Sequence, residues 1–415
     1  MSTTPDLRQQ AQTCKDASRQ LAWLATAEKD RLLQALATSL RQHQSGLLEA
    51  NEKDCQAGQQ AGLSSALLDR LRLTAPRIEA MAEGAEMVAR LTDPIGREVA
   101  WTRPNGLLIR RVKVPLGVLC IIYEARPNVT VESASLAIKA GNGCLLRGSR
   151  SAVNSNQLLL KLIQDCLQAQ GLPREAIQGV ADLRRESIEV LARLNGLIDL
   201  MIPRGGADLI QRVIQCATVP VLETGVGNCH LYVHSAADLD QAVPIIINSK
   251  CSRPAVCNSL ETLLLDRSVA APMLQLLSPQ MQHKVEVRGC PETLHLLGWG
   301  TPVLAQDWDT EFLDQILAVR VVDNLDQALE HIRQHGSGHT EAILSNDLAA
   351  VRRFQREVDA CTVTVNASTR FTDGGEFGFG AEIGISTQKM HARGPVGLEE
   401  LTTYKYWVEG QGQIR

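Results

Sequence analysis

A cysteine at a predicted turn, Cys257, is the residue of this sequence best suited to nucleophilic chemistry. It follows a helical apolar pattern over residues 237–250 and precedes a short apolar run typical of a buried strand. Pro254 cannot continue a helix, so the chain must turn just before the cysteine. Lys250 and Arg253 place two cations nearby, and positive charge lowers a thiol's pKa from about 8.5. The window therefore indicates either a thiolate nucleophile or a small buried hydrophobe, and alone it favours neither.

The remaining cysteines and histidines indicate no second kind of chemistry. The chain has 11 cysteines with no Cys-x-x-Cys pair, which argues against a disulfide framework and against a zinc site. His331 and His335 lie four residues apart with His339 beyond them, but no carboxylate supports them as a ligand set. We therefore expect no bound metal.

The elements that must position Cys257 are predicted to alternate between strands and helices. Residues 5–92 have helical apolar patterns, and residues 99–114 are predicted to form an extended ribbon. From residue 116 onward, buried strands alternate with helices, which predicts parallel sheets covered on both faces. The predicted strands are 116–123, 144–146, 177–180, 197–202 and 219–222, then 262–265, 284–287, 316–322, 342–344 and 361–365. A last strand, 401–408, must pair with the 99–114 ribbon or with a neighbouring subunit.

Polar residues follow several of these strands, where parallel sheets bind ligands. Arg204-Gly205-Gly206 precedes a helix and suits a phosphate, although such a turn is more commonly a simple connection. Arg147-Gly148-Ser149 suits a ribose or its 2′-phosphate, or is a solvated loop. Asn128 is either a helix N-cap or an oxyanion donor. The glycine-dense segment 374–395 carries Lys389, His391 and Arg393, which could clamp an anionic substrate.

Composition excludes several partners. With 415 residues, two or three domains are expected. A net charge of −4 and 3% aromatic residues provide neither a basic field nor stacking surfaces for nucleic acid. No apolar run is long enough for a membrane span, and the N-terminus lacks an apolar signal core. We therefore expect a cytoplasmic protein that binds neither nucleic acid nor membrane.

Several long motifs resemble the gamma-glutamyl phosphate reductase family of the aldehyde dehydrogenase superfamily. They are Val114-Pro-Leu-Gly-Val, Tyr123-Glu-Ala-Arg-Pro-Asn, Arg253-Pro-Ala-Val-Cys-Asn, Glu376-Phe-Gly-Phe-Gly-Ala-Glu-Ile-Gly-Ile-Ser-Thr and Leu401-Thr-Thr-Tyr-Lys. The resemblance spans nearly the whole chain. It implies an α/β fold of the aldehyde dehydrogenase type, with two α/β/α domains and a small β oligomerisation element. The implied domains are 1–98 with 115–233 for NADP, 234–378 for catalysis, and 99–114 with 395–415 for oligomerisation.

The resemblance also implies roles for individual residues. The nucleophile falls on Cys257, and the oxyanion donors fall on Asn128 and the Cys257 backbone N–H. The implied cofactor residues are Arg147, Gly148, Ser149, Arg204, Gly205, Gly206 and Glu311. Glu223 matches the general base of the dehydrogenases, although a reductive reaction needs no water at the thioester. The implied candidates for binding the substrate anions are Arg126, Lys250, Arg253, His391 and Arg393.

The implied reaction is NADPH-dependent reduction of L-glutamyl 5-phosphate to L-glutamate 5-semialdehyde, with release of phosphate, in proline biosynthesis. One alternative is a dehydrogenase that oxidises a free aldehyde through the same thioester, and another is an inactive scaffold. The implied assembly is a homodimer or a dimer-based tetramer. The sequence leaves open whether the chain associates with glutamate 5-kinase, which makes the unstable substrate.

Overall fold

The computed structural model describes residues 6–415, without the side chains of Ala66 and Ala207. The chain forms two compact units. The first contains residues up to Thr224 together with Gly378–Gly384 and Val396–Arg415, and the second contains Gly225–Phe377 and Ile385–Pro395. The chain therefore passes between the units four times. Within the described residues, no helix is long and apolar enough to cross a membrane.

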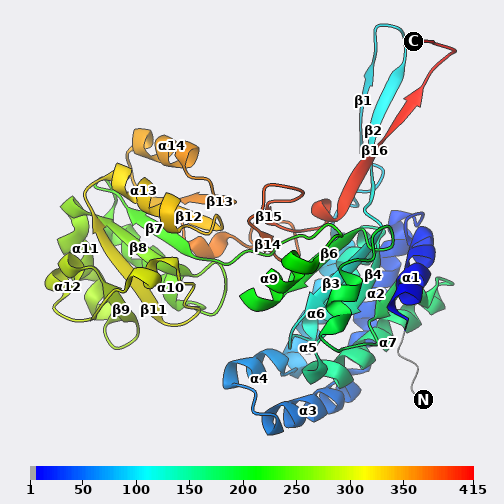
Figure 1. Ribbon diagram of the computed structural model, residues 1–415, viewed down its shortest axis with the longest axis horizontal. Helices are drawn as coiled ribbons and strands as arrows, with labels where there is room; N and C mark the ends of the chain where they lie inside the picture. The colour runs from blue at the N-terminus through cyan, green and yellow to red at the C-terminus, as the bar shows by residue number, and fades with distance from the viewer. Residues whose placement is uncertain (1–5) are drawn as a thin grey trace. The chain divides into compact units, whose positions relative to one another are not determined.

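The first unit is built on a parallel sheet of four strands in the order β5-β4-β3-β6. Its strands are β3 (Val118–Tyr123), β4 (Gly143–Arg147), β5 (Ile177–Gly179) and β6 (Leu200–Arg204). Its helices are α1 (Leu7–Leu21), α2 (Thr26–Gln42), α3 (Gln44–Gln60), α4 (Ser65–Leu71), α5 (Ala75–Arg90), α6 (Asn128–Lys139), α7 (Val153–Ala169), α8 (Glu186–Leu191) and α9 (Ala207–Cys216), with short 3₁₀ turns η1 (Arg150–Ala152) and η2 (Arg174–Ala176). Apolar side chains of α1 and α8 pack on one face of the sheet, and α6 lies on the other (Figure 1). Strand β3 is buried along its whole length because both faces are covered.

Two local predictions for this unit are wrong. Residues 219–222 do not form a strand, because only Val221 bridges to Met201 and Pro220 has no N–H for a ladder. The apolar pattern also predicts one helix-like run over residues 64–91, and the structure divides it into α4 and α5. Thr74 caps α5, with Pro76 in its first turn, and this start signal outweighs the continuous apolar pattern.

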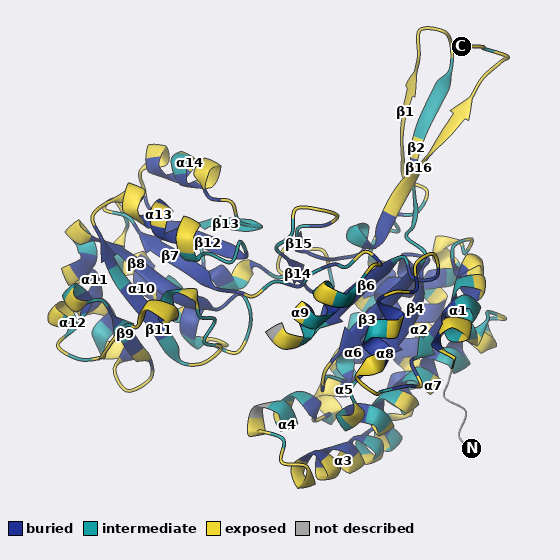
Figure 2. Ribbon diagram, viewed as in Figure 1, coloured by how far each residue is buried: buried dark blue, intermediate teal, exposed yellow. Residues whose placement is uncertain are grey.

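Three antiparallel strands form an arm that extends from the body of the first unit (Figure 1). They are β1 (Glu98–Thr102), β2 (Leu108–Pro115) and β16 (Thr402–Glu409), with the 3₁₀ turn η5 (Glu399–Leu401) just before β16. β16 pairs with β2 from Thr402↔Pro115 to Glu409↔Leu108, so the terminal strand pairs with the ribbon of its own chain. The arm is mostly exposed (Figure 2). One face carries the apolar or aromatic residues Val99, Trp101, Ile109, Tyr404, Tyr406 and Val408.

The second unit is built on a seven-stranded parallel sheet in the order β10-β9-β11-β8-β7-β12-β13. Its strands are β7 (Cys229–Val233), β8 (Leu260–Asp266), β9 (Glu286–Gly289), β10 (Thr301–Pro302), β11 (Ile316–Val322), β12 (Thr340–Leu344) and β13 (Thr362–Val365). A separate ribbon pairs β14 (Ile385–Ser386) with β15 (Gly394–Pro395), and the 3₁₀ turns are η3 (Ala305–Asp309) and η4 (Thr369–Phe371). The patterns predicted every strand of the large sheet except β7 and the two-residue β10.

Helices cover both faces of this second sheet. They are α10 (Leu239–Cys251), α11 (Arg267–Met281), α12 (Pro291–Leu297), α13 (Leu325–His335) and α14 (Leu348–Glu357). Apolar side chains of α10 and α11 form one core, and those of α13 and α14 form a second core on the opposite face. The expected aldehyde-dehydrogenase-type architecture, with parallel sheets between helical layers and a small β element, is confirmed.

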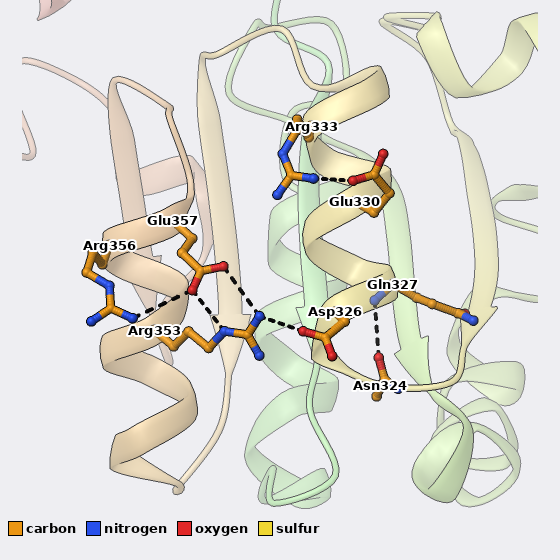
Figure 3. A network of polar contacts seen from close by, with 8 residues as sticks. All are labelled: Asn324, Asp326, Gln327, Glu330, Arg333, Arg353, Arg356 and Glu357. Carbon is orange, nitrogen blue, oxygen red and sulfur yellow. Dashed lines mark hydrogen bonds and ion pairs between the residues drawn. The ribbon is translucent and has the colours of Figure 1, made fainter.

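A surface network links α13 to α14 (Figure 3). Arg353 on α14 contacts Asp326 on α13 at 2.5 Å and Glu357 on its own helix at 2.9 Å. Asn324 caps α13 by accepting a hydrogen bond from the Gln327 backbone N–H. Exposed ion pairs each contribute less than about 1 kcal/mol, so the buried apolar faces provide most of the helix packing energy.

Candidate active site

Cys257 lies on the turn that joins α10 to β8, and it is half-buried. A second chain segment, Gly225–Cys229, passes directly beneath it. A Cβ atom built on Gly227 would lie 1.6 Å from the Cys257 carbonyl oxygen, so this position accepts only glycine without displacement of the cysteine's backbone. The Cys229 thiol donates a hydrogen bond to the same oxygen at 3.1 Å. Two contacts from one segment therefore set the backbone position of Cys257.

The same segment brings Glu311 toward the cysteine. The Gly227 backbone N–H donates a hydrogen bond to Glu311 Oε1 at 2.9 Å. Burial raises the pKa of Glu311 above its usual value, and the hydrogen bond from Gly227 partly opposes this. Glu311 and the Cys257 backbone thus both lie against Gly227.

Lys250 has a partner that its position in the sequence did not reveal. Its ammonium is 1% exposed and lies 2.6 Å from Glu261 Oε2, at the start of β8. Burial raises the pKa of Glu261 to about 7, and the carboxyl also accepts from the Leu313 N–H. The charge of Lys250 is therefore compensated inside the protein, and its structural function is to tie α10 to β8 on either side of the cysteine turn.

Arg253 is exposed on the cysteine turn, and Arg370 joins it from η4. Burial and the nearby positive charge of Arg253 lower the pKa of Arg370, whereas Asp373 and Cys257 act in the opposite direction. Our sequence reasoning missed Arg370. Its position after the carboxyl end of β13 is a signal that could have found it, because ligands bind at such ends.

The glycine-dense segment does not act as one loop. Residues 378–384 belong to the first unit, and the flanking residues 374–377 and 385–395 belong to the second. Two of its predicted cations share one carboxylate, since Lys389 and Arg393 lie 2.5 and 2.8 Å from Asp359. His391, the third, is exposed.

Asn128 is the first residue of α6, and Pro127 occupies the cap position. The N-cap interpretation of Asn128 is therefore wrong. Its side-chain amide donates to Glu132 Oε1 at 2.8 Å, which orients the amide and engages one of its two hydrogens. Arg126 lies half-buried in the loop just before it.

The adjacent strand ends of β3, β4 and β6 bring the predicted cofactor residues of the first unit to one edge of its sheet, with Ile122↔Arg147 and Tyr123↔Arg204 in register. Arg147 donates to the carbonyls of Leu183 (2.9 Å) and Arg184 (3.2 Å), but its buried Nε has no hydrogen-bond partner within residues 6–415. Gly148 and Ser149 follow it, and Ser149 bonds to Ser151 at 2.5 Å.

The end of β6 carries the paired glycines before α9. The buried Nε of Arg204 also lacks a hydrogen-bond partner. The Gly206 N–H donates to Glu124 Oε2 at 3.1 Å, so a carboxylate contacts the helix start where a phosphate was predicted. A Cβ on Gly205 would lie 2.8 Å from that carboxylate, whereas one on Gly206 would meet open space.

Glu223 is half-buried and is the penultimate residue of the first unit's longest segment, which ends at Thr224. Thr224 is held by a hydrogen bond to the Pro203 carbonyl at 2.9 Å. Cys257, Glu311, Lys250 and Arg253 belong to the second unit, whereas Asn128, Glu223, Arg147 and Arg204 belong to the first.

Comparison with known proteins agrees with this architecture. Residues 1–291 match the model of the aldehyde dehydrogenase family, and the chain belongs to that family. Within it, the chain is 52% identical over 417 residues to the gamma-glutamyl phosphate reductase of Moorella thermoacetica, with both chains covered completely. It is also 52% identical to the enzyme of that name from Carboxydothermus hydrogenoformans, over 98% of each chain.

Solved structures show the same relationship. The crystal structure of gamma-glutamyl phosphate reductase from Thermotoga maritima has a TM-score of 0.96 and 45% identity, covering 99% of this chain and 100% of that one. An acetylating aldehyde dehydrogenase from Geobacillus thermoglucosidasius, at 17% identity and a TM-score of 0.72, shares the fold over 99% of this chain and 97% of that one.

Proposed function

We propose that this chain reduces L-glutamyl 5-phosphate to L-glutamate 5-semialdehyde with NADPH, releasing phosphate, in L-proline biosynthesis. The observation that carries the proposal is full-length identity of about half to proteins named for this activity. The setting of Cys257 supports it, because the backbone of a half-buried cysteine on a turn is positioned by Gly227 and Cys229.

Cys257 attacks the acyl carbon as the thiolate. The new Sγ–C bond forms while the C–O bond to phosphate breaks, and the phosphate oxygen leaves with the electron pair. The product is a thioester on Cys257. Acyl phosphates allow this step because phosphate is a far better leaving group than the hydroxide of a free carboxylate.

Asn128 and the Cys257 backbone N–H then donate to the oxyanion that forms on the carbonyl oxygen. One such donor contributes about 10²–10³ in rate. Once the thioester carbon has received a hydride from the bound cofactor, the resulting thiohemiacetal anion would collapse by breaking the Sγ–C bond, which releases the aldehyde and regenerates the thiolate. Glu223 is not needed as a base in this direction, since water at the thioester would hydrolyse it.

The residues at the strand ends of the first unit fit a nicotinamide dinucleotide phosphate. Arg147 and Arg204 each hold a buried Nε that lacks a hydrogen-bond partner among the described residues, and guanidinium groups suit ribose phosphate oxygens. Gly148, Ser149 and Gly205 provide backbone N–H groups beside them, whereas the Gly206 N–H donates to Glu124 Oε2 and would have to exchange that partner for a phosphate oxygen. Glu311, which the family resemblance matches to the ribose-binding glutamate, is the proposed acceptor for a hydroxyl of the nicotinamide ribose. When bound, the cofactor supplies the hydride.

The arm supports self-association, and we propose a homodimer or dimer-based tetramer. Its exposed apolar face is an unusual feature for a protein surface and suits burial against a second copy. A cytoplasmic location stays a prediction from the sequence, and the sequence leaves open whether the chain associates with glutamate 5-kinase.

The decisive assay runs the reaction in reverse, with the semialdehyde and either NADP or NAD. NADPH should form only when phosphate or arsenate is present. Equal rates without either anion would instead support the alternative dehydrogenase. A Cys257→Ser variant should lose turnover, and unchanged turnover would show that another group is the nucleophile.

A further inference from the structure

Two segments of the second unit are joined at the cysteine. Thr369 donates its hydroxyl to the Asn258 carbonyl at 2.7 Å, and the Asn258 side-chain amide donates to the carbonyls of Arg370 (3.3 Å) and Thr372 (2.8 Å). Asn258 follows Cys257 directly. Hydrogen bonds to Asn258, the residue next to the nucleophile, thus hold the backbone of Arg370. The position of Arg370 is therefore coupled to that of Cys257.

This anchoring continues on the helix that ends at the cysteine turn. Ser249 on α10 contacts the Ser368 hydroxyl at 2.9 Å and accepts from the Thr369 N–H at 3.3 Å. Ser249, Asn258, Ser368 and Thr369 are all buried. A buried set of this size, outside the strands, indicates that the η4 turn is held in one position against the cysteine turn.

The guanidinium of Arg370 is incompletely satisfied. Its Nε is buried and has no hydrogen-bond partner within the part of the chain that the structure describes. The positive charge of Arg253 lies close enough to disfavour its charged state. Asp373 is the carboxylate that opposes this, but it also accepts hydrogen bonds from the Gly375 and Glu376 N–H groups in the following turn. Arg370 thus combines a buried Nε, unpartnered within the described chain, with a second arginine nearby, and an anion beside Cys257 would balance both charges.

We propose that Arg370 and Arg253 together bind the phosphoryl group of the acyl phosphate beside Cys257 and stabilise it as it leaves. This rests on the proposed function. The phosphorus is joined through one oxygen to the carbon that Cys257 attacks, whereas the substrate's α-carboxylate is four bonds further along the chain. A dianion also balances two guanidinium charges better than a single carboxylate does. Lys250, neutralised by Glu261, is not part of this pair.

The test measures each substrate's KM in the reverse reaction, with semialdehyde, NADP and inorganic phosphate. Arg370→Gln should raise the KM for phosphate about 10- to 100-fold, as expected for loss of a charged hydrogen bond. The KM for semialdehyde should change less than about 3-fold. Arg370→Lys should fall between, because lysine keeps the charge but not the planar fork. Arg352→Gln on α14 is the matched control and should leave both constants unchanged.

Arg253→Gln gives the same comparison at an exposed position, should Arg370→Gln fail to fold. A raised semialdehyde KM with an unchanged phosphate KM would overturn the proposal and assign the pair to the α-carboxylate. The proposal would also be overturned if Arg352→Gln raised the KM for phosphate as much as Arg370→Gln does. That result would show that the loss of any positive charge has this effect.

A second readout separates this proposal from the proposed function. Inorganic phosphate should slow alkylation of Cys257 by iodoacetamide in the unmodified protein, and about 10-fold more phosphate should be needed in Arg370→Gln. If the unmodified enzyme needs no phosphate for turnover, the proposed function fails, but this protection still demonstrates the anion site. Absence of protection in the unmodified protein overturns the site.

Discussion

Gly227→Ala is the substitution that most directly tests how Cys257 is positioned. The added Cβ would lie 1.6 Å from the Cys257 carbonyl oxygen, 2.4 Å from its carbonyl carbon and 2.6 Å from its Cα. Ordinary contact begins at 3.4 Å, so one of the two backbones must move by about 1.8 Å. All three atoms belong to the cysteine's backbone, so no flexible side chain can absorb the shift.

A displacement of about 1 Å at a reacting group can cost about 10²-fold in rate, so we expect kcat/KM to fall at least that far. The shift would also weaken the hydrogen bond from the Gly227 N–H to Glu311. Steady-state kinetics in the phosphate-dependent assay gives the rate. Iodoacetamide labelling shows whether Cys257 remains accessible.

Gly84→Ala is the matched control, because it adds the same methyl group on α5, where a Cβ meets nothing within 4 Å. It should leave activity unchanged and stabilise the protein by about 0.5–1 kcal/mol, since alanine favours a helix over glycine. If Gly227→Ala retains activity within about 5-fold while folding normally, the close approach does not position the nucleophile and the reasoning is wrong.

Three further predictions concern stability and assembly. Lys250→Met should lower the free energy of unfolding by about 3–5 kcal/mol, because Glu261 is left buried without its partner. Adding Glu261→Leu should recover most of this loss in urea titrations. If the double variant recovers no stability, the pairing of Lys250 with Glu261 is contradicted. Burial lowers the pKa of His339 to about 4, so the unfolded state binds more protons between pH 6.5 and 4 and stability should fall as the pH drops through that window, by about 1.4 kcal/mol per pH unit. His339→Asn should remove that contribution from the difference between pH 7 and pH 5, and an unchanged difference would refute it. Tyr406→Glu on the arm should reduce the mass measured by sedimentation, whereas Arg352→Gln should not; an unchanged mass would show that this face is not the interface.

The order of helices and strands was largely predictable from periodicity. The prediction for 316–322 coincides with β11, and that for 361–365 begins one residue before β13. Strand β7 was missed because His230 interrupts its apolar run. His230 is tolerated there because its Nδ1 lies 3.0 Å from Glu341 on β12, 111 residues away. Such a partner is a property of the fold, and no local window contains it.

In the candidate site, too, local features were predictable from the sequence and long-range partners were not. A turn with a cysteine and a strand-end arginine are local features, and the sequence identified Cys257 and Arg204 in this way. The partners that define the chemistry are not local. Lys250 was expected to face an anion, but Glu261, on the far side of the turn, neutralises it. Arg370 escaped notice because its connection to Cys257 depends on hydrogen bonds through Asn258, across 112 residues.

The pairing of β16 with β2 imposes an order on how this protein can be made. While the chain is being synthesised, the segment from Gly225 to Phe377 is complete long before the strand that β2 needs. Until residues 402–409 emerge, β2 keeps one edge of unpaired backbone groups, which is a template for aggregation. The Asn142 side chain donates a hydrogen bond to the Leu401 carbonyl, so it also lacks this partner until the end of the chain has been synthesised. Deleting residues 402–409 would therefore destabilise the first unit, whose other strands are synthesised first. It would not directly affect the second unit, which immediately precedes most of these residues in the sequence.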